Sequence, residues 1–279
     1  MINGSELGKL YLVGTPIGNL EDITLRAIRI LTEVDVIAAE DTRRTGKLLQ
    51  HLQISTPQIS YHEHSPLSRV EELMSRLQQA DNIALVTDAG MTSISDPGVK
   101  LVQSASALSI DVIPIPGGTA AISALAASGL STDKFVFEGF LPPKEKERQA
   151  RLELLRSETR TVDLYDAPHR IVKTLTDLAT VAGEGREIVL GRELTKIHEE
   201  FWRGSIQDAI ALYTNKRQPK GEYTLVLKGA EETNLIMSED ELKVELKQLL
   251  DNGMTRSQAS RQLAKSTNLS RREIYQLDL

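Results

Sequence analysis

The sequence predicts an α/β protein made of two α/β domains and a small helical module at its carboxyl end. Short runs rich in β-branched residues alternate with helical patterns, which is typical of a mainly parallel sheet with helices on its faces. The 279 residues exceed one average domain, and the last stretch contains only helical patterns. We therefore expect domains at residues 1–118, 119–232 and 233–279, with the active site in a cleft between the first two.

The first expected domain alternates strand and helix patterns. Its strand candidates are Lys9–Val13, Val34–Ala39, Ile83–Val86 and Val112–Ile115. Between the second and third of these, apolar residues at helical spacing mark one face of an amphipathic helix: Leu67, Val70, Leu73, Met74 and Leu77. This order predicts strands whose carboxyl ends share one edge of a sheet, where open α/β sheets bind their ligands.

The second expected domain begins with an alanine-rich helix at Thr119–Ala127. A further helical face follows, containing Ile171, Leu175 and Leu178. The strand candidates are Lys134–Phe140, Thr161–Tyr165, Ile188–Gly191 and Tyr223–Leu227. The rhythm is less regular than in the first domain, so the order of these strands in their sheet is left open.

The carboxyl tail has a different pattern. Leu242, Leu246 and Leu249 predict one helix, and two short helices follow at Thr255–Ala264 and Ser270–Leu277. Ser270 is followed three residues later by a glutamate, which matches a capping box. Two short helices after a turn resemble a helix-turn-helix module.

Composition limits the possible classes of protein. The formal net charge is −6, so a contact with nucleic acid must use local basic patches. The chain contains no cysteine, which excludes disulfides, thiolate metal sites and a cysteine nucleophile. The start of the chain lacks the layout of a signal peptide, and no apolar run approaches the length of a bilayer span. We expect a cytoplasmic protein with no membrane partner.

Three loops that follow strand candidates are suited to a small polar ligand. Gly14–Asn19 and Pro116–Ala120 carry glycines that allow close approach to the backbone, although each could be an ordinary turn or helix start. Asp88–Gly98 is the most unusual stretch, with two carboxylates, two glycines and three hydroxyls. A plain connector rarely needs so many special residues, so we expect this loop to bind a ligand.

Three charged stretches are compatible with RNA contacts or with plain solvent exposure. Glu40–Thr45 could bind phosphate or could be a solvated helix start. Lys144–Arg156 could contact phosphates or be a charged exposed helix. From Met254 onward the basic residues exceed the acidic ones, which favours RNA binding; the basic residues are Arg256, Arg261, Lys265, Arg271 and Arg272, and the acidic ones are Glu273 and Asp278.

His62-Glu63-His64 would place two imidazoles on one strand face, as a metal site requires. The sequence offers no matching third ligand, and loop histidines usually form hydrogen bonds instead. We therefore expect no metal.

Five segments together resemble one known family. They are Leu12–Leu20, Ala39–Thr45, Ser60–His64, Ala167–Arg170 and Arg192–Lys196. They closely resemble the ribosomal small-subunit methyltransferase I family of the tetrapyrrole-methylase superfamily, and the resemblance covers nearly the whole chain. It implies two α/β domains with S-adenosylmethionine in the cleft between them. It also implies a homodimer that methylates the ribose 2′-hydroxyl of a cytidine in the decoding region of 16S rRNA, within the small ribosomal subunit.

The resemblance implies a set of site residues. The expected cofactor-binding residues are Pro16, Asp88, Gly90, Ile94, Ser95, Thr119, Ala120, Tyr165, Ala167 and Leu194. The expected catalytic residues are Glu40, Asp41, Arg43 and Lys196. A carboxylate of Glu40 or Asp41 is the simpler base, and Lys196 could serve only if its pKa were lowered. The expected RNA-binding residues are Arg44, Lys144, Lys146, Arg148, Arg256, Arg261, Arg271 and Arg272.

Two departures from the family pattern bear on the cofactor loops. Met91-Thr92 stand where the family usually has Thr-Pro, and Gly118-Thr119 where it usually has Pro-Ser. Side-chain roles at these positions are therefore in doubt, whereas backbone contacts would survive.

Two other functions remain open from the sequence. One is methylation of a tetrapyrrole, which would need neither RNA nor a basic tail. The other is a regulator whose helix-turn-helix tail binds DNA while the α/β body senses a ligand.

Overall fold

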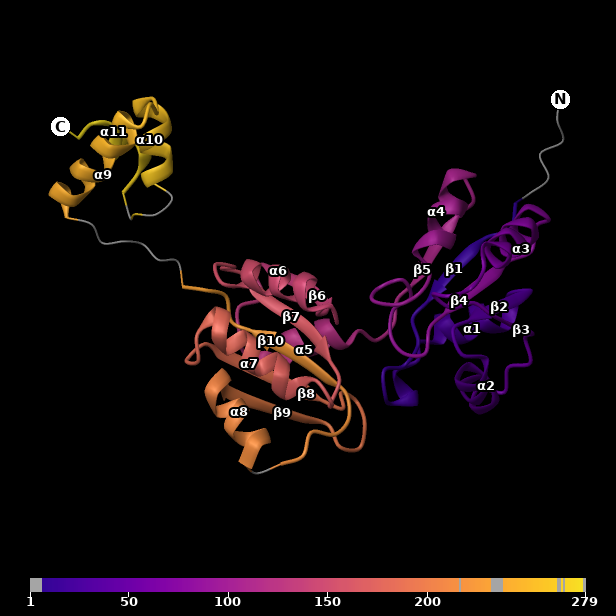
Figure 1. Cartoon of the computed structure of the whole chain (residues 1–279). Coiled ribbons are helices and arrows are strands. Elements are labelled where there is room, and N and C mark those ends of the chain that lie inside the picture. Colours follow the sequence, from indigo (N-terminus) through magenta and orange to yellow (C-terminus); the bar gives the residue numbers. More distant parts are fainter. Residues whose placement is uncertain (1–6, 216, 232–237, 265–266, 268, 278–279) are drawn as a thin grey trace, which may run out of the picture. The chain divides into compact units, whose positions relative to one another are not determined.

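The computed structural model describes residues 7–231 and 238–277, except residues 216, 265, 266 and 268 (Figure 1). The chain divides into two compact units, residues 1–228 and residues 229–279. The domain boundary expected between residues 232 and 233 lies outside the described residues, as do Lys265 and Asp278 of the basic tail. The boundary expected between residues 118 and 119 stays a prediction.

The first sheet of the large unit is parallel throughout, as the alternating pattern predicts. Its strands are β1 (Leu10–Val13), β2 (Val36–Ala39), β3 (Gln58–Ser60), β4 (Ile83–Val86) and β5 (Val112–Ile115). Their order is β3-β2-β4-β1-β5. In the centre, Leu10 of β1 lies between Ile83 of β4 and Val112 of β5. All five strands therefore present their carboxyl ends at one edge.

Helices bury both faces of the first sheet. They are α1 (Leu25–Glu33), α2 (Thr42–His51), α3 (Leu67–Gln78) and α4 (Val99–Ala107), with a short 3-10 helix at Leu20–Asp22. The apolar faces of α3 and α4 pack on one side of the sheet, and those of α1 and α2 pack on the other. Residues of β2 and β4 are consequently buried on both faces, which explains their continuous apolar sequences.

The second sheet is mixed. Its strands are β6 (Phe135–Phe140), β7 (Thr161–Asp166), β8 (Glu187–Arg192), β9 (Glu200–Ser205) and β10 (Tyr223–Leu227). The order is β6-β7-β10-β8-β9; β6 and β7 pair in parallel, and the other neighbours pair antiparallel. The sequence predicts four of these strands but not β9, whose residues lack an alternating apolar pattern.

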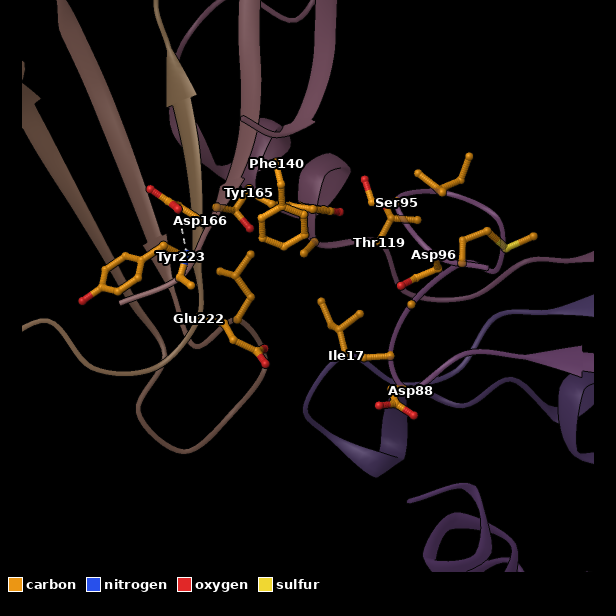
Figure 2. Close-up of a pocket in the computed structure, with 18 of the residues that line it drawn as sticks. Ile17, Asp88, Ser95, Asp96, Thr119, Phe140, Tyr165, Asp166, Glu222 and Tyr223 are labelled. Atoms are coloured by element: carbon orange, nitrogen blue, oxygen red, sulfur yellow. Dashed lines mark hydrogen bonds between the residues drawn. The ribbon is translucent and has the colours of Figure 1, made fainter. Parts of the chain in front are cut away.

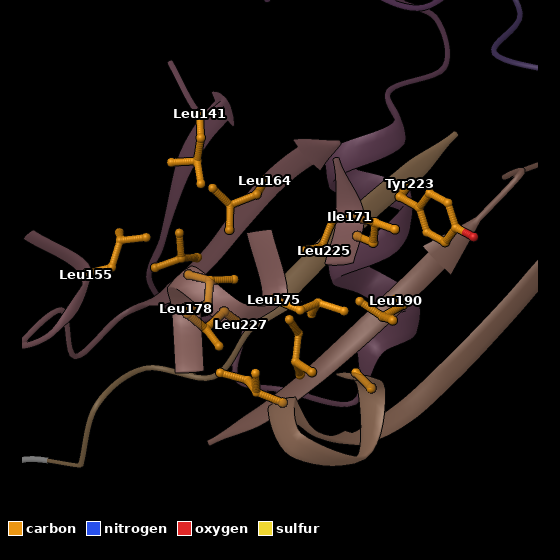
Figure 3. Packing of buried hydrophobic residues seen from close by; sticks show 14 of the residues in the cluster. Leu141, Leu155, Leu164, Ile171, Leu175, Leu178, Leu190, Tyr223, Leu225 and Leu227 are labelled. Carbon is orange, nitrogen blue, oxygen red and sulfur yellow. The ribbon is translucent and has the colours of Figure 1, made fainter. Parts of the chain in front are cut away.

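Helices cover both faces of the second sheet as well. They are α5 (Ala120–Ser128), α6 (Glu145–Leu155), α7 (Ile171–Ala182) and α8 (Ile206–Asn215). Figure 3 shows the larger core, in which Leu175 and Leu178 of α7 pack against Leu164, Leu190 and other residues of the sheet. On the opposite face, residues of α5 pack against β8 and β10.

The described residues of the small unit form three helices, α9 (Glu239–Asp251), α10 (Arg256–Leu263) and α11 (Arg271–Tyr275). They share a small core of Leu242, Leu246, Ala259, Leu263 and Ile274. The capping box predicted at Ser270 is present, and two further boxes start α9 and α10. Within the part of the chain that the structure describes, no helix has both the length and the apolar character that a bilayer crossing needs.

Candidate functional site

A cavity of about 390 Å³ lies at the strand ends of the large unit. It is within the usual range of small-molecule sites, roughly 300–1,000 Å³. Figure 2 shows Phe140, Tyr165, Asp166, Glu222 and Tyr223 on one side of it and Ile17, Asp88, Ser95 and Asp96 on the other. Both sheets therefore contribute to one site.

The loop after β4 forms much of the wall and is held by the first sheet. Thr92 is buried, and its hydroxyl donates to the carbonyls of Val13 at 3.2 Å and Leu85 at 3.3 Å. Gly90 exchanges two backbone hydrogen bonds with Thr15, at 3.0 and 3.1 Å. Thr92, one of the departures from the family pattern, therefore anchors the loop to the backbone below it.

The same loop carries unusual backbone conformations. Ser93 and Ser95 have φ values of 70° and 60°, and Gly90 and Gly98 also have positive φ. Non-glycine residues in this left-handed region cost about 1–3 kcal/mol each and persist where surrounding contacts require them, often at functional sites. Two of these residues, Gly90 and Ser95, line the cavity.

The loops after β1 and β5 touch each other through two glycines. A Cβ built on Gly14 would lie 2.7 Å from the Cα of Gly117, and a Cβ on Gly117 would lie 2.7 Å from the Cα of Gly14. Any side chain at either position would collide with backbone. Their contact sets the spacing between Ile17 and Thr119, which line the cavity.

Three carboxylates and one guanidinium gather on the first-sheet side of the cavity. Glu40 follows β2, and its carboxylate accepts a hydrogen bond from the backbone N–H of Asp88 at 3.2 Å. Asp88 forms an ion pair with Arg44 of α2 at 3.0 Å. Burial raises the pKa of Glu40. Burial, followed by the charge of Glu40, raises the pKa of Asp96 to about 7. The cavity thus holds a carboxyl group, that of Asp96, that can exchange a proton near neutral pH.

The second-sheet side presents aromatic and carboxyl groups. Tyr165 of β7 accepts a hydrogen bond at its hydroxyl from the N–H of Ala121 in the first turn of α5, at 3.2 Å. Asp166 accepts from the N–H of Ala167 at 2.9 Å and from Nε of Arg170 at 3.0 Å. Phe140, at the end of β6, is 51% exposed.

The loop between β8 and β9 joins the two halves. The backbone N–H of Asn19 donates to the hydroxyl of Thr195 at 2.9 Å. A Cβ built on Gly18 would lie 2.7 Å from the carbonyl oxygen of Leu194, so Gly18 permits this close approach. Leu194 reaches the cavity from this loop.

The structure brings most of the predicted cofactor-binding residues together. Every one of them except Pro16 lines the cavity. Of the predicted catalytic residues, Glu40 lines it, whereas Asp41, Arg43 and Lys196 do not. Arg44, predicted only as an RNA contact, lines it too.

Asp41 and Lys196 are held in ion pairs. Asp41 caps α2 and binds Arg43, whose hydrogen bond holds the pKa of Asp41 well below its usual range. Lys196 lies 2.8 Å from Glu193 and 2.9 Å from Glu222. Burial works to lower the pKa of Lys196, but these two carboxylates outweigh it and the pKa is raised. The condition under which Lys196 could act as a base is therefore not met.

Arg148 corrects one predicted RNA contact. Its side chain is only 4% exposed; it binds Asp177 at 2.7 Å and Thr174 at 2.9 Å. A guanidinium buried between α6 and α7 cannot reach a phosphate, so the prediction for Arg148 was wrong. Lys144 and Lys146 of the same segment are exposed.

The predicted basic residues of the small unit differ in their surroundings. Arg261, Arg271 and Arg272 are exposed. Arg256 donates to the backbone carbonyls of Tyr275 and Leu277, and its guanidinium lies 5.8 Å from the Tyr275 ring centroid. Arg256 therefore joins α10 to α11.

Sequence reasoning missed several residues that line the cavity: Ile17, Asp96, Phe140, Asp166, Glu222, Tyr223 and Thr224. Asp96 lies in the loop already singled out, and its position directly after the predicted contacts Ile94 and Ser95 was a usable signal. Tyr223 and Thr224 of β10 had no such signal in the sequence. They reach the cavity because the mixed strand order places the start of β10 beside the end of β7. No group of three histidine, aspartate or glutamate side chains suited to a metal occurs among the described residues.

The α/β fold of two sheets is found in known methylases. The family model for tetrapyrrole (corrin/porphyrin) methylases matches residues 9–210. The crystal structure of uroporphyrin-III-C-methyltransferase from Thermus thermophilus matches with a TM-score of 0.57 at 20% identity, over 79% of this chain and 94% of that one. A structure of that enzyme complexed with S-adenosylhomocysteine also matches, with a TM-score of 0.57 at 17% identity, over 79% and 97% of the two chains.

Curated relatives place the chain more narrowly. A ribosomal RNA small subunit methyltransferase I from Synechocystis sp. is 58% identical over 274 residues, covering 98% of each chain. The protein of the same name from Bacillus subtilis is 43% identical over 97% of this chain and 94% of its own. The chain therefore belongs to the tetrapyrrole methylase family, in the branch of the ribosomal RNA small subunit methyltransferase I proteins. It is a methyltransferase, and S-adenosylmethionine is the cofactor of its family.

Proposed function

We propose that this protein transfers a methyl group from S-adenosylmethionine to a ribose 2′-hydroxyl of 16S rRNA, on a cytidine in the decoding region of the small subunit. The observation that carries the proposal is the cavity, because it combines apolar walls with carboxyl groups, one of which, Asp96, has its pKa raised to about 7. The names of the full-length relatives support an RNA substrate. This substrate would place the reaction in the cytoplasm.

The residues of the cavity suit this cofactor. Ile17, Ala120 and Leu194 offer apolar surface, as an adenosine needs. Among the described residues, Asp88 Oδ1 and Asp166 Oδ2 are buried polar atoms that have no hydrogen-bond partner. Because buried polar atoms are normally satisfied, these oxygens fit a ligand with amino or hydroxyl donors. Their negative charge also suits a cationic ligand.

S-adenosylmethionine supplies a methyl group on a positively charged sulfur. The protein must align the ribose oxygen with that methyl group, exclude water and accept the hydroxyl proton. We assign the proton to the carboxyl pair of Glu40 and Asp96. Burial raises the pKa of both groups, and the charge of Glu40 adds to the effect of burial on Asp96, whose pKa is about 7. A base whose pKa lies near the working pH is the most effective one.

Exposed cations near the site and in the small unit would hold the RNA backbone. The side chain of Arg43 is 88% exposed and that of Arg44 is 67% exposed, and both residues lie in the first turn of α2, the helix that follows Glu40. Lys144, Lys146, Arg261, Arg271 and Arg272 are further candidates, because all are exposed. Because the chain has a net charge of −6, a contact with RNA phosphates requires local clusters of exposed lysine and arginine side chains such as these. The expected homodimer is proposed on the family resemblance alone.

The first prediction tests the reaction. The protein is incubated with labelled S-adenosylmethionine and small subunits that lack this modification, and the labelled RNA is hydrolysed in alkali. Because alkaline cleavage needs a free 2′-hydroxyl, a ribose methyl group leaves an alkali-resistant dinucleotide that identifies the nucleotide. We expect one labelled cytidine in the decoding region. The single-turnover rate should rise with pH through about pH 7, as Asp96 ionises.

Matched variants distinguish residues that accept the hydroxyl proton from residues that only bind the cofactor. Glu40→Gln and Asp96→Asn should each lower the single-turnover rate by about 100-fold or more while S-adenosylmethionine still binds. Asp41→Asn is the control, because that carboxylate lies outside the cavity, and it should leave the pH profile unchanged. Label on a base instead of a ribose, or methyl transfer to a tetrapyrrole without RNA, would contradict the proposal.

A further inference from the structure

Phe140 is an exposed aromatic side chain at the edge of the cavity. It is 51% exposed and lines the cavity at the end of β6. The sequence contains only four phenylalanines and one tryptophan. Phe140 does not serve to fill the hydrophobic core, because neither cluster of buried residues of the second sheet includes it.

A β-bulge turns Phe140 toward this position. Phe137 pairs with Asp163 and Phe140 pairs with Tyr165, so three steps along β6 match two steps along β7. The register shifts between Phe137 and Gly139, and Gly139 has a φ of 62°. Without the extra residue, alternation would point Phe137 and Phe140 to opposite faces of the sheet. The bulge places both rings on the face of Tyr165.

Neighbouring groups hold the ring and give it a charged partner. The ring centroids of Phe140 and Tyr165 are 5.5 Å apart, and those of Phe137 and Tyr165 are 5.0 Å apart. The guanidinium of Arg170 lies 5.6 Å from the Phe140 centroid and is itself held by Asp166 at 3.0 Å. The ring therefore has supporting neighbours although Phe140 is exposed. Figure 2 shows it beside Tyr165 at the cavity.

We propose that Phe140 is the stacking platform for the nucleobase of the nucleotide whose ribose enters the cavity. This inference rests on the function proposed above and adds how the substrate is recognised. Proteins bind unpaired bases by stacking them on aromatic side chains, and an enzyme that modifies a nucleotide must take it out of the helical stack. Arg170 strengthens the platform, because a guanidinium beside an aromatic ring adds a cation–π contribution.

The competing role is contact with the adenine of S-adenosylmethionine. The exposure of Phe140 argues for the larger substrate, since small ligands are mostly enclosed by their sites. The apolar surface of Ile17, Ala120 and Leu194 is also available for the cofactor. The two roles differ in which binding constant depends on the ring.

The second prediction tests this proposal with three variants of Phe140 and one control variant. Phe140→Ala removes the ring, Phe140→Leu keeps apolar bulk without an aromatic face, and Phe140→Trp keeps a face. Phe135→Ala is the matched control, because Phe135 is the exposed phenylalanine at the other end of β6. For each protein we measure KM for deficient small subunits, the single-turnover rate, the Kd for S-adenosylmethionine by calorimetry, and the thermal midpoint.

Phe140→Ala and Phe140→Leu should raise KM for the subunit about 5- to 150-fold, the range expected for loss of one base–aromatic stack. Phe140→Trp should restore KM, and Phe135→Ala should leave it unchanged. The Kd for S-adenosylmethionine should stay within about twofold in all four, because the platform serves the other substrate.

Two results overturn the inference. One is wild-type KM in both Phe140→Leu and Phe140→Ala. The other is a rise in the Kd for S-adenosylmethionine with KM for the subunit unchanged, which would assign the ring to the cofactor. If the wild-type protein labels no ribose at all, the proposed function has failed instead, whatever the variants do.

Discussion

At the scale of single residues, Asp163 carries an ionisable carboxyl group that is buried in the protein interior. It lies on β7, is fully buried, and neither of its carboxylate oxygens has a hydrogen-bond partner among the described residues. Burial raises its pKa from an ordinary value near 3.8 to about 7. The folded state therefore favours the neutral carboxyl group. The stability that this protonation contributes is complete below pH 3.8 and is lost as the pH rises toward 7.

The third prediction follows from this sign. Asp163→Asn keeps the shape of the neutral carboxyl group and cannot ionise. Its free energy of unfolding should therefore exceed that of the wild type by a margin that grows between pH 5 and pH 8. One pKa unit corresponds to about 1.4 kcal/mol, so the margin at pH 8 should reach a few kcal/mol. Urea unfolding across this pH range measures it.

Asp133→Asn is the control for this measurement, because Asp133 is exposed in the loop before β6. It should shift the unfolding curve by less than about 0.5 kcal/mol at any pH. If Asp163→Asn and the wild type differ by the same amount at pH 5 and pH 8, the carboxyl group of Asp163 does not titrate with a raised pKa.

At the scale of secondary-structure elements, the contact between the loops after β1 and β5 leads to the fourth prediction. Gly14→Ala places a methyl group against the backbone of Gly117 and should destabilise the protein by about 1–3 kcal/mol. Because these loops carry Ile17 and Thr119, affinity for S-adenosylmethionine should fall too. Thermal unfolding and calorimetry measure the two effects.

Gly46 offers a matched comparison inside α2. A Cβ built there has its nearest neighbour at 3.6 Å, which is an ordinary contact. Gly46→Ala should therefore stabilise the protein by about 0.5–1 kcal/mol, because alanine favours the helix interior. Equal effects of the two substitutions would show that the close approach at Gly14 has no energetic importance.

Elements also show how far the sequence predicts this structure. In the first sheet, apolar strands alternate with helices, so parallel pairing and a shared carboxyl edge could be inferred locally. Glu40, Asp88 and Thr119 follow such strands and line the cavity as a result. The glycine-rich and hydroxyl-rich character of the loop after β4 was likewise visible before its conformation was known.

The second sheet could not be predicted to the same extent. The order of its strands depends on antiparallel pairing between strands that are distant in the sequence. The residues of β9 show no alternating apolar pattern from which a strand could be predicted. The position of Phe140 depends on a bulge, which is a property of the paired strands rather than of β6 alone. A charge pattern also cannot distinguish Arg148 from its exposed neighbours, because burial beside Asp177 is a tertiary contact.

At the scale of the whole molecule, the division into two units gives the fifth prediction. A chain that ends at Lys228 keeps both sheets and every residue that lines the cavity. Its Kd for S-adenosylmethionine should match the full-length protein within about twofold, since nothing that forms the site is removed. Its affinity for small subunits should fall about 10-fold or more at moderate salt, with a shallower salt dependence, because exposed arginines are lost.

The full-length double variant Arg261→Ala, Arg272→Ala is the control for this truncation. Both side chains are exposed, so the variant should keep its fold and still lose part of the salt dependence. If the truncated protein binds subunits as tightly as the full-length chain, the small unit does not contact RNA. If it no longer binds S-adenosylmethionine, residues beyond Lys228 support the cavity.

The capping boxes at Ser238, Thr255 and Ser270 have a consequence for how the chain acquires its structure. Each box closes within four residues, so the start of each helix is encoded by its immediate neighbours. Strand β1, by contrast, pairs with β5, which follows all other strands of its sheet in the sequence. Contact order is therefore low in the last fifty or so residues and high in the sheets, and low contact order goes with rapid folding. This helical segment is thus the one that needs least help from the rest of the polypeptide in order to fold.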